Sequence, residues 1–310
     1  MRILVTGAAG YIGSVLVPEL LRAGHSVLAL DSFMYGQTSL LDAVADDRLE
    51  VVRGDVRDAV RMKSLVEGAD VLIPLACLTG APACDRDPAG AAAVLVEAID
   101  VMLRLRSPEQ RILFPNTNSG YGLGEGSLHC DEQTPLRPIS LYGRLKCEAE
   151  RRILDSGNAI TLRLATAFGA SPRMRLDLLV NDFTYRAATD RFLVLYEAGF
   201  KRNFIHVRDV ARAFLHGLDH FDAMRDAAYN VGLDDANLDK RELCEAIQRH
   251  VPDFFFTEAP IGEDPDKRNY LVSNARIRAA GFTPEWPLDR GIRELLRAYQ
   301  IVRRSAFSNL

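Results

Sequence analysis

The strongest constraint on the fold is a regular alternation of short apolar runs and helical patterns over the first half of the chain. Such runs, bounded by turn residues, are typical of buried strands, and strands that alternate with helices indicate βαβ units. The expected strands are Arg2–Thr6, Ser26–Asp31, Leu49–Gly54, Val71–Leu75, Arg111–Pro115 and Ala159–Leu164. The expected helices are Ile12–Ala23, Arg57–Glu67, Pro88–Leu105 and Leu141–Ser156. We therefore predict an α/β fold with a doubly wound parallel sheet of the Rossmann type.

The alternation weakens after about residue 170, where Pro, Asp and Arg become more frequent. We interpret residues 1–170 as a dinucleotide-binding domain to which some later segments return, and residues 171–310 mainly as a smaller mixed α/β lobe. Open α/β sheets bind ligands beyond the carboxyl ends of their strands, so the lobe is expected to cover that edge. Phe254–Phe256 is predicted to be a buried strand.

A glycine-rich turn follows the first expected strand and opens the first helix, which is the context of a dinucleotide fingerprint. Glycine lets the backbone approach a diphosphate, whose charge the helix N-terminus stabilises. Asp31 ends the next strand, where a carboxylate accepts hydrogen bonds from the adenosine ribose and repels a 2′-phosphate. The expected cofactor is therefore NAD rather than NADP. Its predicted contacts are Gly7, Gly10, Tyr11, Ile12, Gly13, Asp31, Asp55, Val56, Leu75, Ala76, Tyr142 and Lys146.

Tyr142 and Lys146 carry the strongest chemical signal, because a spacing of four places both on one face of a helix. The ammonium group of Lys146 could lower the pKa of the phenol, so that Tyr142 exchanges a proton with a substrate hydroxyl. A hydroxyl partner is expected at the end of the fifth strand, where Thr117 and Ser119 both qualify. This pattern predicts hydride-transfer chemistry.

Composition excludes several other classes of protein. The formal net charge of -4 gives no electrostatic case for nucleic acid binding. Five cysteines form no CxxC pair and six histidines form no metal-binding motif, so we predict reduced thiols and no metal site. The N-terminal residues do not resemble a secretory signal, and no apolar run is long enough to span a membrane. A cytoplasmic enzyme is expected.

The TGxxGxxG turn, the strand-end hydroxyl, the YxxxK pair and the run Arg202–Val210 together resemble the extended short-chain dehydrogenase/reductase family, in its nucleotide-sugar epimerase and dehydratase group. The resemblance covers nearly the whole chain. It selects Thr117 over Ser119 as the catalytic hydroxyl, and it implies that Arg202 contacts the diphosphate of a nucleotide-linked sugar. His206 suits a buried structural role as well as a functional one.

The chain departs from two branches of that family. Sugar 4,6-dehydratases carry an Asp-Glu pair after the catalytic threonine, and related decarboxylases carry a glutamate there. This chain has Asn118 and Ser119, neither of which transfers protons at neutral pH. The resemblance therefore implies redox chemistry at carbon 4 of the sugar.

Four runs are similar to enzymes that oxidise GDP-D-glycero-D-manno-heptose at carbon 4 for capsule polysaccharide synthesis, with 2-oxoglutarate able to recycle NADH. These runs are Leu78–Pro82, Pro115–Gly122, Arg173–Phe183 and Gly262–Arg268. The resemblance implies a GDP-linked substrate. The predicted substrate contacts are Thr79, Thr117, Asn118, Ser119, Arg175, Asn181, Arg202 and Arg268.

Two alternatives remain open at this point. A nucleotide-sugar 4-epimerase would use the same Thr117, Tyr142 and Lys146 through a transient ketone. A non-catalytic NAD-binding sensor would need no intact catalytic residues. We further expect a homodimer, because relatives pair through helices equivalent to Pro88–Leu105 and Leu141–Ser156, and the first carries a wide apolar stripe.

Overall fold

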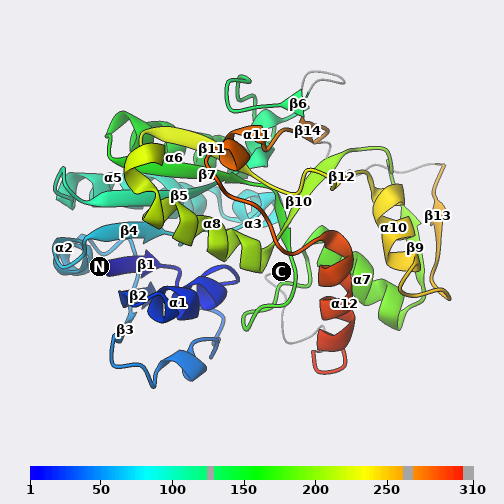
Figure 1. The fold of residues 1–310 in the computed structure, drawn as a ribbon, viewed down its shortest axis with the longest axis horizontal. Coiled ribbons are helices and arrows are strands. Elements are labelled where there is room, and N and C mark those ends of the chain that lie inside the picture. Colours follow the sequence, from blue (N-terminus) through cyan, green and yellow to red (C-terminus); the bar gives the residue numbers. More distant parts are fainter. Residues whose placement is uncertain (124–128, 261–267, 303–310) are drawn as a thin grey trace.

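A computed structural model describes residues 1–123, 129–260 and 268–302. Its centre is a seven-stranded sheet in which every neighbouring pair is parallel (Figure 1). The order across the sheet is β11 (Ala227–Val231), β7 (Ala159–Leu164), β5 (Arg111–Thr117), β4 (Val71–Pro74), β1 (Arg2–Thr6), β2 (Ser26–Asp31) and β3 (Leu49–Arg53). The doubly wound α/β fold predicted from the alternation is confirmed.

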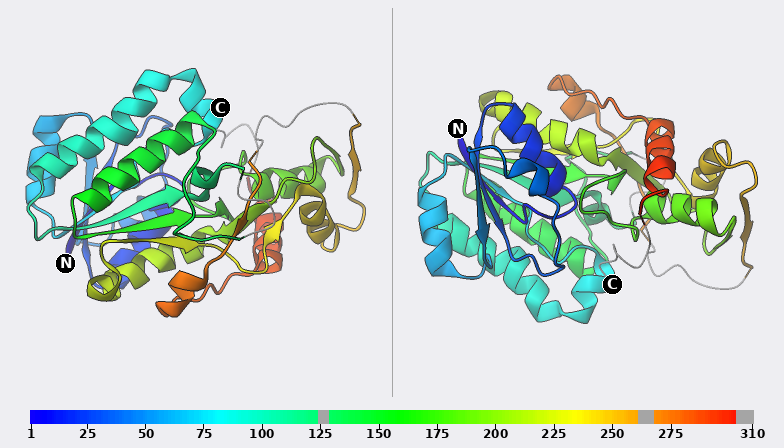
Figure 2. Two further views of the ribbon diagram at one scale, coloured as in Figure 1. Left: turned by 90° about the horizontal axis from the view of Figure 1, so that it is seen from above. Right: turned by 90° about the horizontal axis from the view of Figure 1, so that it is seen from below.

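Helices cover both faces of this sheet (Figures 1 and 2). On one face, α1 (Gly13–Arg22) and α8 (Val207–Asp219) pack on side chains such as Ile3, Val5 and Leu113. On the other face, the apolar sides of three helices pack on residues such as Leu4, Leu72 and Phe114; these are α2 (Ala59–Glu67), α5 (Ala98–Leu105) and α6 (Leu141–Asp155). Parallel strands are buried on both faces, which explains their continuous apolar sequences.

The expected helix Pro88–Leu105 is interrupted. It consists of α4 (Pro88–Ala92), a π-helical turn (Ala93–Glu97) and α5, preceded by the short α3 (Ala81–Arg86). Apolar periodicity does not reveal a single π turn, because the turn inserts one residue without removing the stripe.

The second half of the chain, together with β6 from the first half, forms three small sheets, and it adds further helices around the carboxyl edge of the large sheet. The small sheets pair β8 (Thr166–Phe168), β10 (Arg202–His206) and β12 (Asn237–Leu238); β9 (Phe192–Leu195) with β13 (Phe255–Glu258); and β6 (His129–Cys130) with β14 (Leu271–Val272). Among the described residues, the remaining helices are α7 (Leu179–Thr189), α9 (Phe221–Met224), α10 (Lys240–Gln248), α11 (Ala275–Ala279) and α12 (Leu288–Ala298), and 3₁₀ turns lie at Leu41–Ala43 and Asn118–Tyr121. Strand β11 and helix α8 from this half complete the large sheet and cover it.

The prediction of a buried strand at Phe254–Phe256 is wrong in one respect. The strand exists, but Phe255 is 61% exposed and stacks on Phe192 of the neighbouring strand. Among the described strands, β13 pairs with β9 alone, at the far end of the lobe (Figure 1), so Phe254 is buried in the core and Phe256 is only partly buried against it. In the described ranges, we find no helix long and apolar enough to cross a membrane.

Candidate active site

A cavity of about 1230 Å³ lies at the carboxyl edge of the large sheet, between the strand ends and the second half of the chain. All twelve residues predicted to bind the cofactor line this cavity. Six of the eight predicted substrate residues line it too, namely Thr79, Thr117, Ser119, Arg175, Arg202 and Arg268. Most of the run Gly262–Arg268 lies outside the described residues, which include only its last member, Arg268.

The glycine turn has no space for side chains at two positions. Gly7 has a φ of +67°, and a Cβ there would lie 2.7 Å from the backbone nitrogen of Ala76. A Cβ on Gly13 would lie 2.4 Å from the carbonyl oxygen of Ala8. The turn therefore presents bare backbone to the cavity at the start of α1, where a helix N-terminus stabilises a diphosphate.

Asp31 is held at the end of β2 by the backbone around it. Its carboxylate accepts hydrogen bonds from the backbone N–H of Ala9 at 2.9 Å and of Phe33 at 2.8 Å. The first of these bonds fixes the carboxylate against the glycine turn. A fixed negative charge at this place suits ribose hydroxyls and disfavours an additional phosphate.

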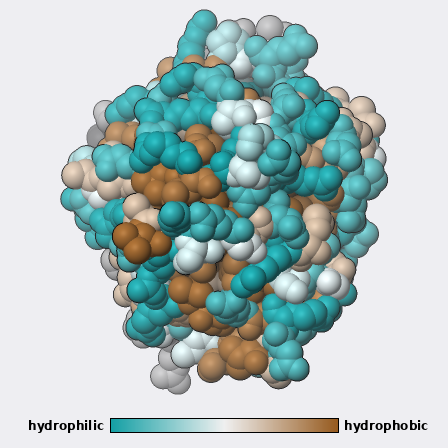
Figure 3. All heavy atoms as spheres, turned by 90° about the vertical axis from the view of Figure 1, so that its left-hand side faces the viewer, coloured by the Kyte–Doolittle hydropathy of each residue, from teal (hydrophilic) through white to brown (hydrophobic). Residues whose placement is uncertain are grey.

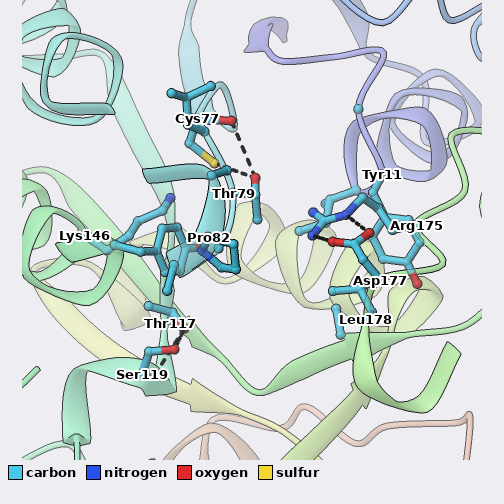
Figure 4. Close-up of a pocket in the computed structure, with 18 of the residues that line it drawn as sticks. Tyr11, Cys77, Thr79, Pro82, Thr117, Ser119, Lys146, Arg175, Asp177 and Leu178 are labelled. Atoms are coloured by element: carbon cyan, nitrogen blue, oxygen red, sulfur yellow. Dashed lines mark hydrogen bonds and ion pairs between the residues drawn. The ribbon is translucent and has the colours of Figure 1, made fainter. Parts of the chain in front are cut away.

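Thr117, Ser119 and Arg268 form a chain of contacts on one wall of the cavity. The Thr117 hydroxyl donates to the Ser119 hydroxyl oxygen at 2.9 Å, and the Arg268 guanidinium donates to the same oxygen. Figure 4 shows Thr117 and Ser119 on the side of the cavity that also carries Lys146. Arg268, from near the other end of the chain, thus reaches the hydroxyl residues that follow β5.

Helix α6 supplies both Tyr142 and Lys146. The helix begins where the Ser140 side chain accepts a hydrogen bond from the backbone N–H of Gly143, at 3.1 Å. The Lys146 ammonium donates to the carbonyl oxygen of Pro115 at 2.8 Å and lies 4.6 Å from the centre of the Phe114 ring. Lys146 therefore faces the end of β5, and Tyr142, one turn earlier on α6, lines the same cavity as Thr117.

Burial has the largest effect on the pKa values of Tyr142 and Lys146. It raises the pKa of the Tyr142 phenol far above its usual range, and the thiols of Cys77 and Cys84 raise it further. The guanidinium groups of Arg175 and Arg268 act in the opposite direction. Burial also lowers the pKa of the Lys146 ammonium. The structure thus gives a raised pKa for Tyr142, whereas the sequence suggested that Lys146 would lower it.

A buried ion pair fixes α6 on the sheet. The Glu150 carboxylate, one turn beyond Lys146, accepts from the Arg163 guanidinium at 2.8 Å and from the Thr161 hydroxyl at 2.9 Å. Arg163 also donates to the phenol oxygen of Tyr121 at 3.1 Å. Both side chains of the pair are less than a tenth exposed. This pair limits how far the helix can slide or turn relative to β7.

The segment 169–177, here called the strap, runs from β8 to α7. It lies across the cavity from the wall that carries Thr117 and Ser119. Arg175 donates to the Asp177 carboxylate at 2.6 Å, and Figure 4 shows this pair beside Tyr11. Asn181 does not line the cavity. Its amide accepts from the backbone N–H of Gly169 at 2.9 Å and donates to the carbonyl oxygen of Arg175 at 2.8 Å. Asn181 therefore holds the two ends of the strap together.

Two other sequence candidates lie away from the cavity wall. Asn118 is 1% exposed and lies behind that wall, so its amide does not face a substrate. His206 is fully buried, and its ring stacks on Trp286 at 4.4 Å between centroids. His206 Nε2 lies 2.7 Å from the Glu294 carboxylate, and Nδ1 accepts from the backbone N–H of Arg208, so the histidine joins β10 to α12.

Several residues of the cavity wall were not found from the sequence. They are Tyr35, Arg173, Asp182, Arg186, Tyr196, Phe200 and Lys240. Arg173 and Asp182 lie in the run Arg173–Phe183 that carried the resemblance, but they were not singled out there. A further sequence signal was the spacing of four between Asp182 and Arg186, which form an ion pair at 2.9 Å on α7. Such pairs are common on solvent-exposed helices, so the spacing alone does not indicate a cavity.

Comparison with known proteins adds three findings. The sequence profile of the family described as "NAD dependent epimerase/dehydratase family" matches residues 3–232. The low-salt glycan biosynthesis protein Agl12 of Haloferax volcanii is 29% identical, over 96% of this chain and 98% of its own length. The uncharacterized UDP-glucose epimerase YtcB of Bacillus subtilis is 30% identical, over 68% of this chain and 71% of its own length.

The fold also resembles solved structures. A UDP-glucose 4-epimerase of Thermus thermophilus, solved in complex with NAD, superposes with a TM-score of 0.83. It is 24% identical, and the match covers 98% of this chain and 100% of that one. This likeness extends through the second half of the chain, whose boundaries the sequence pattern left less defined.

Proposed function

The chain belongs to the NAD dependent epimerase/dehydratase family, and from that premise we propose that it oxidises a nucleotide-linked sugar at carbon 4. Membership makes it an NAD-dependent enzyme that modifies nucleotide-linked sugars. The proposal adds the reacting carbon and the residues that act on it. The observation that carries it is the convergence of Thr117, Tyr142 and Lys146 on the cavity that also holds the glycine turn.

The cavity fits NAD. The bare backbone of the glycine turn and the N-terminus of α1 would hold the diphosphate, and Asp31 would hold the adenosine ribose. When bound, the cofactor supplies a nicotinamide ring that accepts a hydride from carbon 4.

The chain's own residues would manage the proton. Tyr142 would take the proton of the sugar hydroxyl, since a phenol on a fixed helix can act as a general base once ionised. Thr117 would orient that hydroxyl, because its side chain lies on the same wall. Lys146 would hold a positive charge beside the phenolate that forms, which favours its ionisation.

Other reactions of the family have less support. Eliminating water from a sugar, or removing its carboxylate, needs an acid or base close to carbons 5 and 6. In the turn after Thr117, Asn118 is buried behind the wall and the Ser119 hydroxyl is engaged by Thr117 and Arg268. Neither provides a carboxylate, which favours simple redox chemistry at carbon 4.

We propose GDP-D-glycero-D-manno-heptose as the substrate and a 4-keto product, with 2-oxoglutarate as a candidate oxidant for NADH. Support comes from the sequence resemblance: all four of its runs contribute residues to the cavity wall, the run Gly262–Arg268 through Arg268. The arginines of this wall suit a nucleoside diphosphate. The 4-epimerase is the second candidate, and the name of the Bacillus relative favours it. A non-catalytic sensor is disfavoured because the catalytic residues are intact.

Product analysis tests these assignments. We would incubate the purified chain with GDP- and UDP-linked sugars, GDP-heptose included, with and without 2-oxoglutarate, and measure product masses and stereochemistry. The 4-dehydrogenase predicts a product that lacks two hydrogens and accumulates only with the oxo acid. Unchanged mass with inverted stereochemistry at carbon 4 would show an epimerase. Loss of water would overturn the interpretation of Asn118 and Ser119.

Replacing Tyr142 by Phe tests the mechanism. The variant keeps the ring but has no group to take the sugar proton, so we expect turnover to fall by about a hundredfold or more. NAD binding, measured by calorimetry, should stay close to that of the unmodified chain, because the glycine turn and Asp31 are intact. Undiminished turnover would contradict the role given to Tyr142.

A further inference from the structure

The start of the strap is bound to the glycine turn by hydrogen bonds. The Tyr11 phenol donates to the carbonyl oxygen of Gly169 at 2.7 Å, and the Asn181 amide donates to the phenol oxygen at 3.4 Å. The Asn181 amide oxygen in turn accepts from the backbone N–H of Gly169 at 2.9 Å. The Ser171 hydroxyl donates to the carbonyl oxygen of Tyr11 at 2.8 Å. Tyr11 therefore holds the strap through its side chain and through its backbone.

The other end of the strap places Arg175 at the cavity. The Asn181 amide donates to the carbonyl oxygen of Arg175 at 2.8 Å, so one side chain contacts both the Tyr11 phenol and the backbone of Arg175. Arg175 lines the cavity and binds the Asp177 carboxylate at 2.6 Å. Figure 4 shows this pair beside Tyr11, across the cavity from Lys146. The place of Arg175 thus depends on contacts that begin at Tyr11.

The charge of Arg175 acts on the catalytic tyrosine. The Arg175 side chain is largely buried, and its positive charge lowers the pKa of the Tyr142 phenol. The groups that act on Arg175 itself are Asp177, Tyr142 and Cys77. The other groups that act on Tyr142 belong to the segment after β4, to α3 and to the chain after β13; they are Cys77, Cys84 and Arg268. Because the Coulomb energy falls with distance, moving Arg175 away would make the phenolate less favourable.

Tyr11 itself does not titrate where the enzyme works. Burial raises the pKa of its phenol far above the usual range, and the charges of Glu294 and Asp177 raise it further. The Asn181 amide and the charge of Arg175 act in the opposite direction without outweighing burial. The phenol therefore remains a hydrogen-bond donor at neutral and moderately alkaline pH, and a change of rate in that range does not come from its own ionisation.

We propose that Tyr11 is a positioning residue: its phenol holds the strap so that the charge of Arg175 stays near Tyr142. The contacts run through Gly169 and Asn181, which bind both the phenol and the strap backbone. The inference rests on the proposed function, because the proton transfer that it supports is the one assigned there to Tyr142. It gives the Tyr11 phenol a role beyond the cofactor contact predicted from the sequence.

Hydrogen exchange tests the holding of the strap without turnover. Tyr11→Phe keeps the ring but removes the donor to Gly169, so local opening of the strap should become easier. We expect the backbone N–H groups of the strap to exchange on the order of tenfold faster, the effect of about one hydrogen bond. Tyr229→Phe is the matched control, since it removes a buried phenol from β11 at the outer edge of the large sheet. Unchanged strap exchange in Tyr11→Phe would overturn the proposal.

A double-mutant cycle tests the route through Arg175. With the sugar that reacts in the product analysis, Arg175→Ala should shift the alkaline rise of kcat/KM upward by on the order of one pH unit. Tyr11→Phe should shift it in the same direction by less. Added to Arg175→Ala, Tyr11→Phe should cause no further shift, because the phenol acts through Arg175. Additive shifts would overturn the proposal, as would a rate that falls equally at every pH.

A variant that does not fold leaves the test intact. If Arg175→Ala does not fold, Arg175→Gln enters the same cycle, since it also removes the charge. Arg175→Lys should shift the profile less than either, because it keeps the positive charge. Faster strap exchange with no sugar oxidised would contradict the proposed function but not the contact between Tyr11 and the strap. Normal strap exchange in an active Tyr11→Phe variant would overturn this inference alone.

Discussion

At the scale of single residues, the cavity wall opposes the negative charge that the proposed mechanism needs on Tyr142. Burial keeps the phenol protonated, and the thiols of Cys77 and Cys84 act in the same direction. Arg175 and Arg268 favour the phenolate, and they lie on opposite walls of the cavity. The charges that favour ionisation of the Tyr142 phenol therefore come from arginines distant in sequence.

A pH profile tests this balance. Because the pKa of Tyr142 is raised, the phenol is protonated near neutral pH, and the rate of sugar oxidation should rise as the pH increases. Arg268→Ala removes a cation that favours the phenolate, so its profile should shift to higher pH. We would measure kcat/KM from pH 6 to about pH 10. A profile that falls with pH would contradict a phenolate base.

Single residues were predictable where a local motif constrains them. Gly7, Asp31, Tyr142 and Lys146 lie in short motifs whose spacing already implies their contacts. Arg173 and Asn181 both lie in the run Arg173–Phe183, whose resemblance predicted Asn181 as a substrate contact, and only the path of the strap shows that Arg173 lines the cavity and Asn181 does not. The local sequence pattern does not specify how the strap runs through the structure.

At the scale of elements, α6 matters most because it carries two catalytic candidates on one rigid helix. Its predicted range, like those of β1, β2 and β7, was accurate because continuous apolar or amphipathic patterns define these elements. The π turn before α5 and the exposure of β13 depend on contacts with residues distant in sequence, which a local pattern does not show. They were therefore not predictable from periodicity.

The Glu150–Arg163 pair should be essential for the stability of α6. Glu150→Ala leaves the Arg163 charge buried without its carboxylate, and breaking such a pair typically costs about 3–5 kcal/mol. Glu148→Ala on the same helix is the control, since Glu148 binds Arg152 near the surface, where pairs contribute about 1 kcal/mol or less. Chemical denaturation would measure both. Equal losses would argue against a special role for the buried pair.

The stability that Glu294 gives to the packing of α12 should be lost at acid pH. Burial alone would raise the pKa of this carboxyl, but hydrogen bonds from His206 and Ala170 outweigh burial and hold the pKa below its usual value. Because the folded-state pKa is depressed, the stabilisation is complete above the unfolded pKa and is lost as the pH falls through the folded one.

Glu294→Gln should therefore be less stable than the unmodified chain at pH 7. It should also lose less stability between about pH 5 and pH 3, since an amide does not titrate. Urea unfolding at several pH values would measure both effects. The same acid dependence in both proteins would contradict the assignment to Glu294.

At the scale of the whole molecule, the predicted dimer would use the face formed by α4, α5 and α6. Much of the apolar stripe on the first of these segments is already buried within the chain, at Ala91, Leu95, Ala98 and Met102. Val94, Val101 and Leu105 remain partly exposed. Figure 3 shows an adjoining face, where apolar patches are separated by hydrophilic residues.

Sedimentation tests this assembly. We expect a dimer at micromolar concentration, and we expect Val101→Glu to shift it to monomer, because a charge buried between two helices is costly. Val60→Glu is the control, since Val60 is 86% exposed on α2. A monomer for the unmodified chain would reject the dimer.

Strand β11 has a consequence for how such chains can be divided. It comes from the second half of the sequence but forms the outer edge of the large sheet, where it pairs with β7 from Ala227 to Val231. A fragment ending near residue 170 would leave unpaired the N–H and C=O groups of β7 that face β11, and a bare strand edge recruits other chains into aggregates. The two halves are thus not interchangeable modules. Exchanging the second half with that of a relative would also replace the strand that terminates the sheet.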